Sequence, residues 1–144
     1  RVRSMAPLVV GFDLDMTLID SRPGVIASFN ALNAELGTHI DVLAIASRLG
    51  PTLETEMAVY FPPDEIDAAC DRYRAIYAEL GPPGSSLLPG AAEAVACVRD
   101  LGGTTLVVTA KFEPNAHLCL DQVGVEVDHV IGWRHGPQKG ETLL

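Results

Sequence analysis

The stretch VVGFDLDMTLID, from Val9 to Asp20, decides how this chain folds. Its opening residues are apolar, and a continuous apolar run predicts a strand that is buried on both faces of a sheet. The run stops at two acids, Asp13 and Asp15, which one leucine separates. Because residues i and i+2 of a strand point to the same side, the two carboxylates are expected to converge. Carboxylates that close together repel each other unless a cation or hydrogen bonds compensate.

A long helical segment follows this stretch. Apolar residues recur at helical spacing after Asp20 until Gly37, which is expected to end the first helix. Pro63 and Asp64 are expected to open the last helix of the segment, with shorter helical patterns in between. Residues 20–81 are therefore predicted to be helical throughout.

The second half of the chain alternates helices and strands. GPPGSSLLPG, residues 81–90, is rich in glycine and proline and predicts the crossing back from the helical segment. Two apolar runs, TTLVVTA and HVIGW, predict strands, and helical patterns precede, separate and follow them. Alternating helices and apolar strands predict an α/β fold with a parallel sheet that helices cover on both faces.

Polar side chains follow each of the three predicted strands. Thr109 comes at the end of the second strand, and Lys139 lies in the loop after the third. Ligands of open parallel sheets bind beyond the carboxyl ends of the strands, so these residues and the two aspartates are expected to form one site. Magnesium suits such a site, because it takes oxygen ligands and keeps several waters and a substrate phosphate. An Asp-x-Asp pattern can also simply cap a turn, which is the structural alternative.

These motifs resemble those of the haloacid dehalogenase superfamily. GFDLDMTLID resembles the first motif, an apolar strand followed by Asp-x-Asp-x-Thr, which matches Asp13, Asp15 and Thr17. LVVTAK resembles the second motif at Thr109, and GPQKGETLL resembles the third at Lys139. LLPGAAEAV is similar to the return from a helical cap in the phosphoglycolate phosphatase-like branch of the superfamily.

The resemblance implies a division of the chain into two domains. Residues 1–19 and 86–144 would form a Rossmann-like α/β core that is incomplete at its C-terminus, and residues 20–85 would form an inserted α-helical cap. Such a cap is expected to close over the site and exclude water. The fourth motif of the family, a strand that ends in paired acids, is not found after Lys139. The chain is therefore expected to be the front part of a phosphatase.

The resemblance also implies roles for individual residues. Asp13 would attack phosphorus and form an aspartyl-phosphate, and Asp15 would protonate the leaving alcohol and later deprotonate water. The phosphoryl group would be bound by Thr17, Thr109, the backbone N–H of Ala110, and Lys139. Mg²⁺ would be held by the Asp13 carboxylate and the backbone carbonyl of Asp15. Dehalogenases that resemble this motif lack an acid at the position of Asp15 and need no metal, so this acid implies phosphoryl transfer.

The implied function is the hydrolysis of a small phosphorylated metabolite, such as phosphoglycolate, by a Mg²⁺-dependent phosphatase. A β-phosphoglucomutase-like phosphotransferase is one alternative. A catalytically incompetent fragment that binds a partner is another. Without the strand of the fourth motif, the strand at residues 7–12 would present a bare edge, which favours self-association.

Composition narrows the classes of partner. The chain has 10 Lys and Arg against 19 Asp and Glu, a formal net charge of −9, which argues against binding nucleic acid. No apolar run is long enough to span a membrane, which favours a cytoplasmic protein. Cys70, Cys97 and Cys119 are widely spaced and are expected to be buried, reduced thiols. Lys111 could steer an anionic substrate and Arg48 could meet a substrate carboxylate or phosphate, but both are expected to be ordinary solvated side chains.

Overall fold

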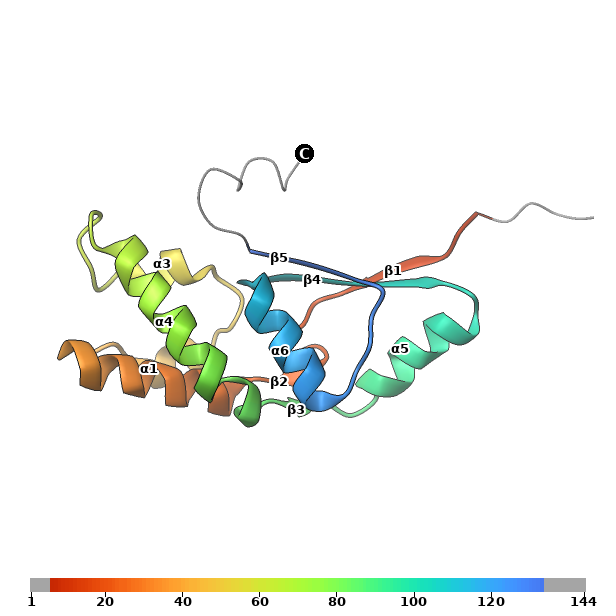
Figure 1. The fold of residues 1–144 in the computed structure, drawn as a ribbon, viewed down its shortest axis with the longest axis horizontal. Coiled ribbons are helices and arrows are strands. Elements are labelled where there is room, and N and C mark those ends of the chain that lie inside the picture. Colours follow the sequence, from red (N-terminus) through yellow and green to blue (C-terminus); the bar gives the residue numbers. More distant parts are fainter. Residues whose placement is uncertain (1–5, 134–144) are drawn as a thin grey trace, which may run out of the picture.

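The computed structural model describes residues 6–133 of the chain, and Figure 1 shows how they are arranged. The elements in chain order are β1 (Val9–Phe12), β2 (Ile19–Asp20), α1 (Arg22–Leu36), α2 (Val42–Ala46), α3 (Leu53–Met57), α4 (Ile66–Leu80), the 3₁₀ helix η1 (Pro82–Gly84), β3 (Ser86–Leu87), α5 (Ala91–Asp100), β4 (Thr104–Phe112), α6 (Glu113–Val123) and β5 (His129–Trp133). The helices α1, α3 and α4 lie together at one end of the molecule, on the left in Figure 1.

The central sheet has the strand order β1-β4-β5, and both pairs of neighbours are parallel. Val10 lies beside Thr105 in the first pair, and Val107 lies beside Val130 in the second. The predicted α/β class with a parallel sheet is confirmed. β4 ends at Phe112, two residues beyond the strand that its apolar run predicts.

Helices cover only one face of this sheet in the part of the chain that the structure describes. Thr105 and Val107 are fully buried on the face that α5 and α6 cover (Figure 1). On the other face Val9, Val108 and Ile131 are 55%, 50% and 45% exposed. The predictions that the first strand is buried on both faces and that helices cover both faces of the sheet are therefore wrong for these residues. The three strands follow one another in a single direction across the sheet, and crossovers of one hand place α5 and α6 on the same face.

The first helix of the insertion begins and ends as its sequence predicts. α1 has Pro23 in its first turn, where a backbone N–H would have no intrahelical acceptor, so the missing N–H of proline costs no hydrogen bond. The helix ends at Gly37, which adopts the left-handed conformation. α4 begins at Ile66 rather than at Pro63, because the N–H of Glu65 closes a turn with the carbonyl of Pro62 at 2.9 Å. The segment before α4 is thus a turn and not the first turn of the helix.

Two segments carry the chain out of the core and back, and they pack closely. β2 and β3 pair antiparallel at this crossing, with Ile19 beside Leu87. A Cβ atom on Gly24 would overlap the carbonyl oxygen of Gly81, so the two backbones touch where only glycine fits. The helices α1–α4 lie between these crossings. The division into a core of residues 1–19 and 86–144 and a cap of residues 20–85 stays a prediction.

Candidate active site

The turn after β1 places Asp13 and Asp15 on either side of a buried leucine. Leu14 is fully buried, and its carbonyl accepts the N–H groups of Thr17 and Leu18 at 3.2 and 3.0 Å. Asp13 is exposed, and its carboxylate accepts the N–H of Leu14 at 2.8 Å. Because the side chain between them is fixed in the core, both carboxylates face the same cavity.

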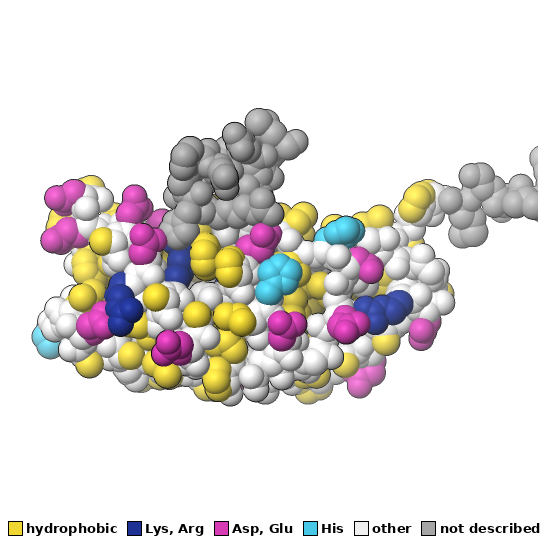
Figure 2. All heavy atoms as spheres, viewed as in Figure 1, with side chains coloured by type: hydrophobic (Ala, Val, Ile, Leu, Met, Phe, Trp, Pro, Cys, Tyr) yellow, Lys and Arg dark blue, Asp and Glu magenta, His cyan; other side chains and the backbone are white. Residues whose placement is uncertain are grey.

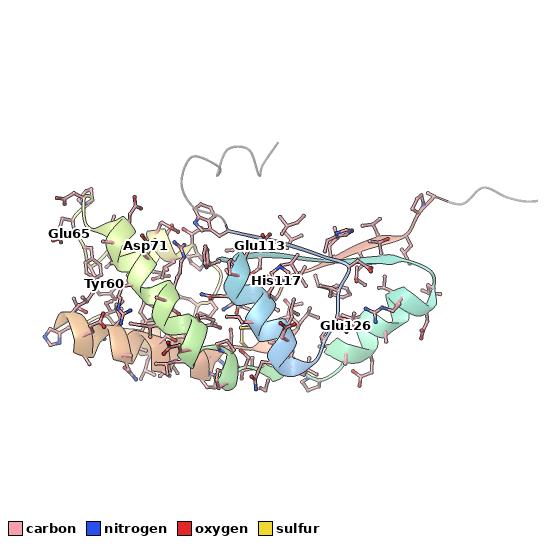
Figure 3. The ribbon with its side chains drawn as sticks, in the orientation of Figure 1. Tyr60, Glu65, Asp71, Glu113, His117 and Glu126 are labelled. Atoms are coloured by element: carbon pink, nitrogen blue, oxygen red, sulfur yellow. The ribbon has the colours of Figure 1, made fainter. Side chains whose placement is uncertain are left out.

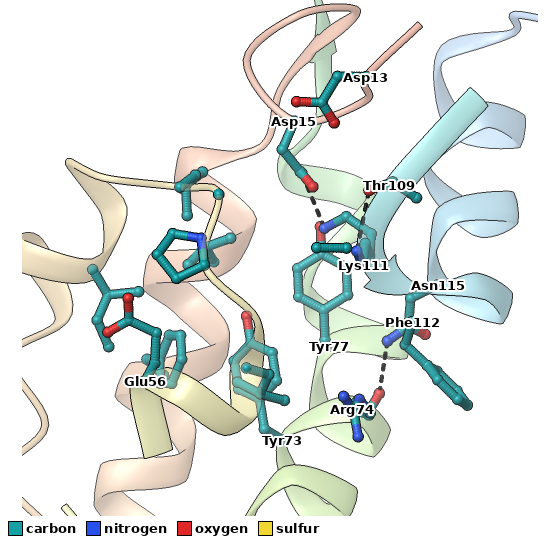
Figure 4. Close-up of a pocket in the computed structure, with 18 residues that line it drawn as sticks. Asp13, Asp15, Glu56, Tyr73, Arg74, Tyr77, Thr109, Lys111, Phe112 and Asn115 are labelled. Carbon is teal, nitrogen blue, oxygen red and sulfur yellow. Dashed lines mark hydrogen bonds and ion pairs between the residues drawn. The ribbon is translucent and has the colours of Figure 1, made fainter. Parts of the chain in front are cut away.

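Asp15 is held by partners that Asp13 lacks among the described residues. The hydroxyl of the buried Ser21 donates a hydrogen bond to Asp15 Oδ1 at 2.5 Å, and Lys111 Nζ lies 3.1 Å from the same oxygen. Lys111 Nζ also donates to the hydroxyl of Tyr77 at 2.7 Å and lies 4.0 Å from the centre of the Tyr77 ring (Figure 4). The prediction that Lys111 is a solvated side chain is wrong, because its side chain is only 10% exposed.

The carboxyl end of β4 contributes the second group of site residues. The pairing of β4 with β5 shifts register between Val108 and Phe112, and such an irregularity redirects side chains at the end of a strand. Thr109 Oγ1 accepts the backbone N–H of Lys111 at 3.1 Å, which leaves the hydroxyl proton of Thr109 available to a ligand. Thr109 and Ala110 line the same cavity as the two aspartates.

This cavity has a volume of about 190 Å³ and lies where the strand ends meet the helical insertion (Figure 4). On the core side it is lined by Asp13, Asp15, Thr109, Ala110, Lys111, Phe112 and Asn115. On the side of the insertion it is lined by Val25, Phe29, Ile45, Leu49, Gly50, Pro51, Leu53, Glu56, Tyr73, Arg74 and Tyr77. A cavity between two parts of a fold, with convergent polar groups at one end, is typical of a small-molecule site.

The structure brings together four of the site residues that the sequence predicts: Asp13, Asp15, Thr109 and Ala110. Thr17 lies in the exposed turn after Asp15 and does not line the cavity. Lys139 lies outside the described residues. Arg48 is exposed, as predicted, and pairs with Glu56 at 2.9 Å.

Sequence reasoning missed the role of several residues in this cavity. Tyr73 and Tyr77 lie four residues apart on α4, and that spacing places them on one face of a helix, which the sequence does show. Lys111 follows Thr109 by two residues along β4, so the alternation of a strand could have placed both on one side. Asn115, on α6, donates from Nδ2 to the carbonyl of Arg74 at 3.2 Å, a contact that no local pattern predicts.

Burial keeps both tyrosines of the cavity protonated. Desolvation raises the pKa of Tyr73 and of Tyr77 well above the ordinary value for a phenol. The Tyr77 hydroxyl accepts the hydrogen bond from Lys111 and lies 3.4 Å from Cys119 Sγ. Both hydroxyls therefore remain neutral across the physiological pH range.

The oxygen atoms at this site fit part of a magnesium shell. Asp13 has an exposed carboxylate with no ion pair to a described residue, which is the type of ligand that magnesium takes. The Asp15 side chain is already engaged by Ser21 and Lys111, so its backbone carbonyl is the better candidate. Between residues 6 and 133, no cluster of three Asp, Glu, His or Cys side chains is placed to hold a metal.

The cavity and its aspartates agree with what similar proteins indicate. The family profile of the haloacid dehalogenase-like hydrolases matches residues 10–139. The chain is 31% identical over 122 residues to "Tyrosine-protein kinase PtkA" of Mycobacterium tuberculosis, covering 84% of this chain and 42% of that protein. It is 30% identical over 128 residues to "Probable phosphatase IndB" of Dickeya dadantii, covering 84% of this chain and 55% of that protein. The chain thus spans about half the length of these relatives.

Solved structures share the fold over almost the whole chain. A haloacid dehalogenase-like hydrolase from Streptococcus pneumoniae has a TM-score of 0.77 at 26% identity, covering 95% of this chain and 67% of that one. The structure of protein tyrosine kinase A from Mycobacterium tuberculosis has a TM-score of 0.74 at 26% identity, covering 97% of this chain and 68% of that one. With its Asp13-x-Asp15 turn at the end of β1, this chain belongs to the haloacid dehalogenase-like hydrolases.

Proposed function

We propose that the full-length protein is a Mg²⁺-dependent phosphatase that hydrolyses a small phosphomonoester through an aspartyl-phosphate. One observation carries the proposal: the two aspartates of one cavity have unlike surroundings. Asp13 is exposed and has no ion pair to a described residue, as a nucleophile requires, whereas Ser21 and Lys111 hold Asp15 in a fixed position. A pair of acids in different environments suits two different roles in one reaction.

The reaction would proceed in two steps. A carboxylate oxygen of Asp13 forms a bond to phosphorus while the bond between phosphorus and the leaving oxygen breaks, and Asp15, which carries a proton at this stage, gives it to that oxygen. Water then attacks the aspartyl-phosphate, Asp15 takes a proton from the water, and the Asp13 carboxylate is restored. The hydroxyl of Thr109 and the N–H of Ala110 would donate hydrogen bonds to the phosphoryl oxygens. The role of Lys139, balancing negative charge, stays a prediction.

Magnesium would be bound by the carboxylate of Asp13 and the carbonyl of Asp15. When bound, it would neutralise charge on the phosphoryl oxygens. Among residues 6–133, no cluster of three Asp, Glu, His or Cys side chains adds a further ligand.

The test measures phosphate release from a panel of phosphomonoesters, phosphoglycolate included, by the full-length protein with and without a chelator. Asp13→Asn is expected to abolish turnover, and the chelator is expected to reduce it strongly. Asp20→Asn is the matched control, because Asp20 lies seven residues further on and pairs with Arg22 at the surface. Turnover that survives Asp13→Asn, or that ignores the chelator, would refute the proposal.

A phosphotransferase is the second candidate, and the similarity to a protein named as a tyrosine kinase favours keeping it. The same aspartyl-phosphate would then pass to an acceptor hydroxyl instead of water, as in a β-phosphoglucomutase-like enzyme. The two are separated by supplying acceptors, sugar phosphates or a tyrosine peptide, and measuring phosphorylated acceptor against free phosphate. An excess of phosphorylated acceptor would favour transfer.

The predictions about nucleic acid, self-association and location are part of this proposal. Figure 2 shows acidic side chains spread over one face of the molecule with few basic ones among them, which supports the expectation that nucleic acid is not a partner. β1 has an unpaired edge in the described sheet, which supports self-association of this chain through that edge. No described helix is long and apolar enough to cross a membrane. The cytoplasmic location and a role as a binding fragment stay predictions.

A further inference from the structure

The helical insertion presents an apolar wall to the cavity. Its contributors come from α1, α2, α4 and the segment around α3: Val25, Phe29, Ile45, Leu49, Leu53 and Tyr73. The rings of Phe29 and Tyr73 pack against each other with their centres 4.3 Å apart and their planes tilted by 32°. The part of a substrate that lies beyond its phosphoryl group would therefore contact hydrocarbon and aromatic surface.

The cations that line the described cavity are each paired with a carboxylate. Arg74 Nη2 lies 2.8 Å from Glu54, and Lys111 Nζ lies 3.1 Å from Asp15. Glu56 is likewise paired, with Arg48 at 2.9 Å. A carboxylate or a second phosphate on the leaving group would have to compete with these internal partners for a positive charge. A charged group that loses water without gaining a partner binds poorly, so the paired cations disfavour an anionic leaving group.

Tyr73 adds one polar group to this apolar wall. Its side chain is buried and lines the cavity, and among residues 6–133 its hydroxyl makes no hydrogen bond. Figure 4 shows the side chain extending from α4 with its hydroxyl at the end nearer to Asp15. Burial raises the pKa of Tyr73, so the hydroxyl keeps its proton and can donate a hydrogen bond. The hydroxyl is open to the cavity and is not among the buried polar atoms that lack a partner, so a hydrogen-bond acceptor on a ligand would take the place of water there.

We propose that the leaving group of the substrate is uncharged, has an apolar body about the size of one ring, and carries one hydrogen-bond acceptor for the Tyr73 hydroxyl. This inference rests on the proposed phosphomonoester hydrolysis and narrows its substrate class. The volume of about 190 Å³ has to hold the phosphoryl group as well, which limits the leaving group to about one small ring, since a cavity of roughly 150 Å³ can hold benzene. Phosphoglycolate, whose leaving group carries a carboxylate, becomes a poor substrate under this proposal.

The test compares isosteric esters in the full-length protein. Benzyl phosphate and the three pyridylmethyl phosphates have the same shape, and only the latter carry a ring nitrogen that accepts a hydrogen bond. At pH 8 with Mg²⁺, kcat/KM for benzyl phosphate should exceed that for phosphoglycolate by about tenfold or more, and the best pyridylmethyl isomer should exceed benzyl phosphate about fivefold. Tyr73→Phe should bring the ratio of that isomer to benzyl phosphate close to one.

Tyr60→Phe is the matched control, because Tyr60 lies outside the cavity near the surface of the insertion (Figure 3), where its hydroxyl accepts the N–H of Asp41 at 3.2 Å. This variant should keep the preference for the pyridylmethyl ester. A preference for phosphoglycolate over benzyl phosphate would overturn the uncharged leaving group. An unchanged ratio in Tyr73→Phe, or equal rates for all four isosteres, would overturn the role of Tyr73.

Binding measured without turnover separates this inference from the proposed function. Benzylphosphonate and phosphonoacetate cannot be hydrolysed, and calorimetry should show tighter binding of benzylphosphonate and of its best pyridyl isostere. One outcome is that no ester is hydrolysed, yet this order of affinity holds and Tyr73→Phe removes the preference for the pyridyl compound. The proposed hydrolysis then fails, and the inference that the cavity prefers an uncharged ring with an acceptor stands. Equal or reversed affinities would overturn the inference.

Discussion

The ion pair between Asp15 and Lys111 should contribute measurably to stability, and a double-mutant cycle can isolate it. The pair joins the turn after β1 to the end of β4 at 3.1 Å, with the side chains 19% and 10% exposed. At an effective dielectric constant of about 20, two unit charges at that distance attract by about 5 kcal/mol. Solvent reaches part of Asp15, and the measured coupling should therefore lie well below this value. We expect about 2 kcal/mol, between the values for exposed and for buried pairs.

The cycle consists of Asp15→Asn, Lys111→Met and the double variant, each compared with the wild type by urea unfolding of the full-length protein at pH 7. Asn keeps an acceptor for Ser21, so that Asp15→Asn removes the charge and little else. Lys111→Met alone leaves the Asp15 charge without its cation, and the double variant removes that penalty. The coupling energy is the difference between the double variant and the sum of the single variants.

The chain provides a matched control in the surface pair of Asp20 and Arg22. Its atoms lie 2.8 Å apart, closer than in the first pair, but the Arg22 and Asp20 side chains are 52% and 22% exposed. A pair of this kind should couple by less than about 1 kcal/mol. If the Asp15–Lys111 coupling is no larger than that of the control pair, Lys111 is solvated and the geometry of the site described above is refuted.

Three further predictions concern stability and reactivity. Gly24→Ala should lower the free energy of unfolding by about 3 kcal/mol in urea, since the new methyl group would overlap the carbonyl of Gly81. Hydrogen bonds from the N–H and hydroxyl of Thr105 hold the pKa of Asp128 below its ordinary value of 3.8. The ionised Asp128 therefore stabilises the folded protein above that pH, and this contribution is lost as the pH falls below it. The melting temperature of the wild type should therefore fall more steeply below about pH 4 than that of Asp128→Asn. Cys97 is exposed and should react with a maleimide at neutral pH in the folded protein.

Each of these predictions has its own control. Gly11→Ala should change stability little, because a Cβ there meets only Val108 at an ordinary 3.9 Å. Asp121→Asn, at another exposed carboxylate, should keep the acid dependence of the wild type. Burial raises the pKa of Cys70 to about 12, so this thiol should react only after unfolding. Equal stability of the two alanine variants would contradict the first prediction. An acid profile that Asp128→Asn leaves unchanged would contradict the second, and labelling of Cys70 in the folded protein would contradict the third.

The succession of helices and strands could be predicted because its signals are local. An apolar run that stops at Asp13 marks the end of β1, and Gly37 marks the end of α1. The face of a strand that is covered is not a local property. Val9 and Val108 belong to apolar runs, yet both are about half exposed, since the crossovers place the helices on the other face of the sheet. The prediction that the thiols are buried fails at Cys97 for a similar reason, because the helical face it occupies depends on packing.

The end of the cavity that the aspartates line could be predicted because its signals are local, whereas the end that the insertion lines could not. Asp13 and Asp15 follow β1, and Thr109 lies near the end of β4, where the apolar runs of the sequence end. Lys111 meets Tyr77, 34 residues away in the sequence, only because α4 packs against the end of β4 and α6. A lysine at the end of a strand is usually solvated, and no pattern within the strand could show that an aromatic ring covers this one.

The placement of Lys111 has a consequence for the predicted motion of the insertion. Lys111 lies near the end of β4 and Asp15 follows β1, both in the central sheet, whereas Tyr77 lies on α4. A rotation of α1–α4 about the glycine contact between Gly24 and Gly81 would break the hydrogen bond from Lys111 to Tyr77 and leave the ion pair to Asp15 intact. Opening would then admit water and substrate without disturbing the position of the acid. Closing would return the Tyr77 ring over the Lys111 ammonium and exclude water from the Asp15–Lys111 pair, where a lower dielectric strengthens it.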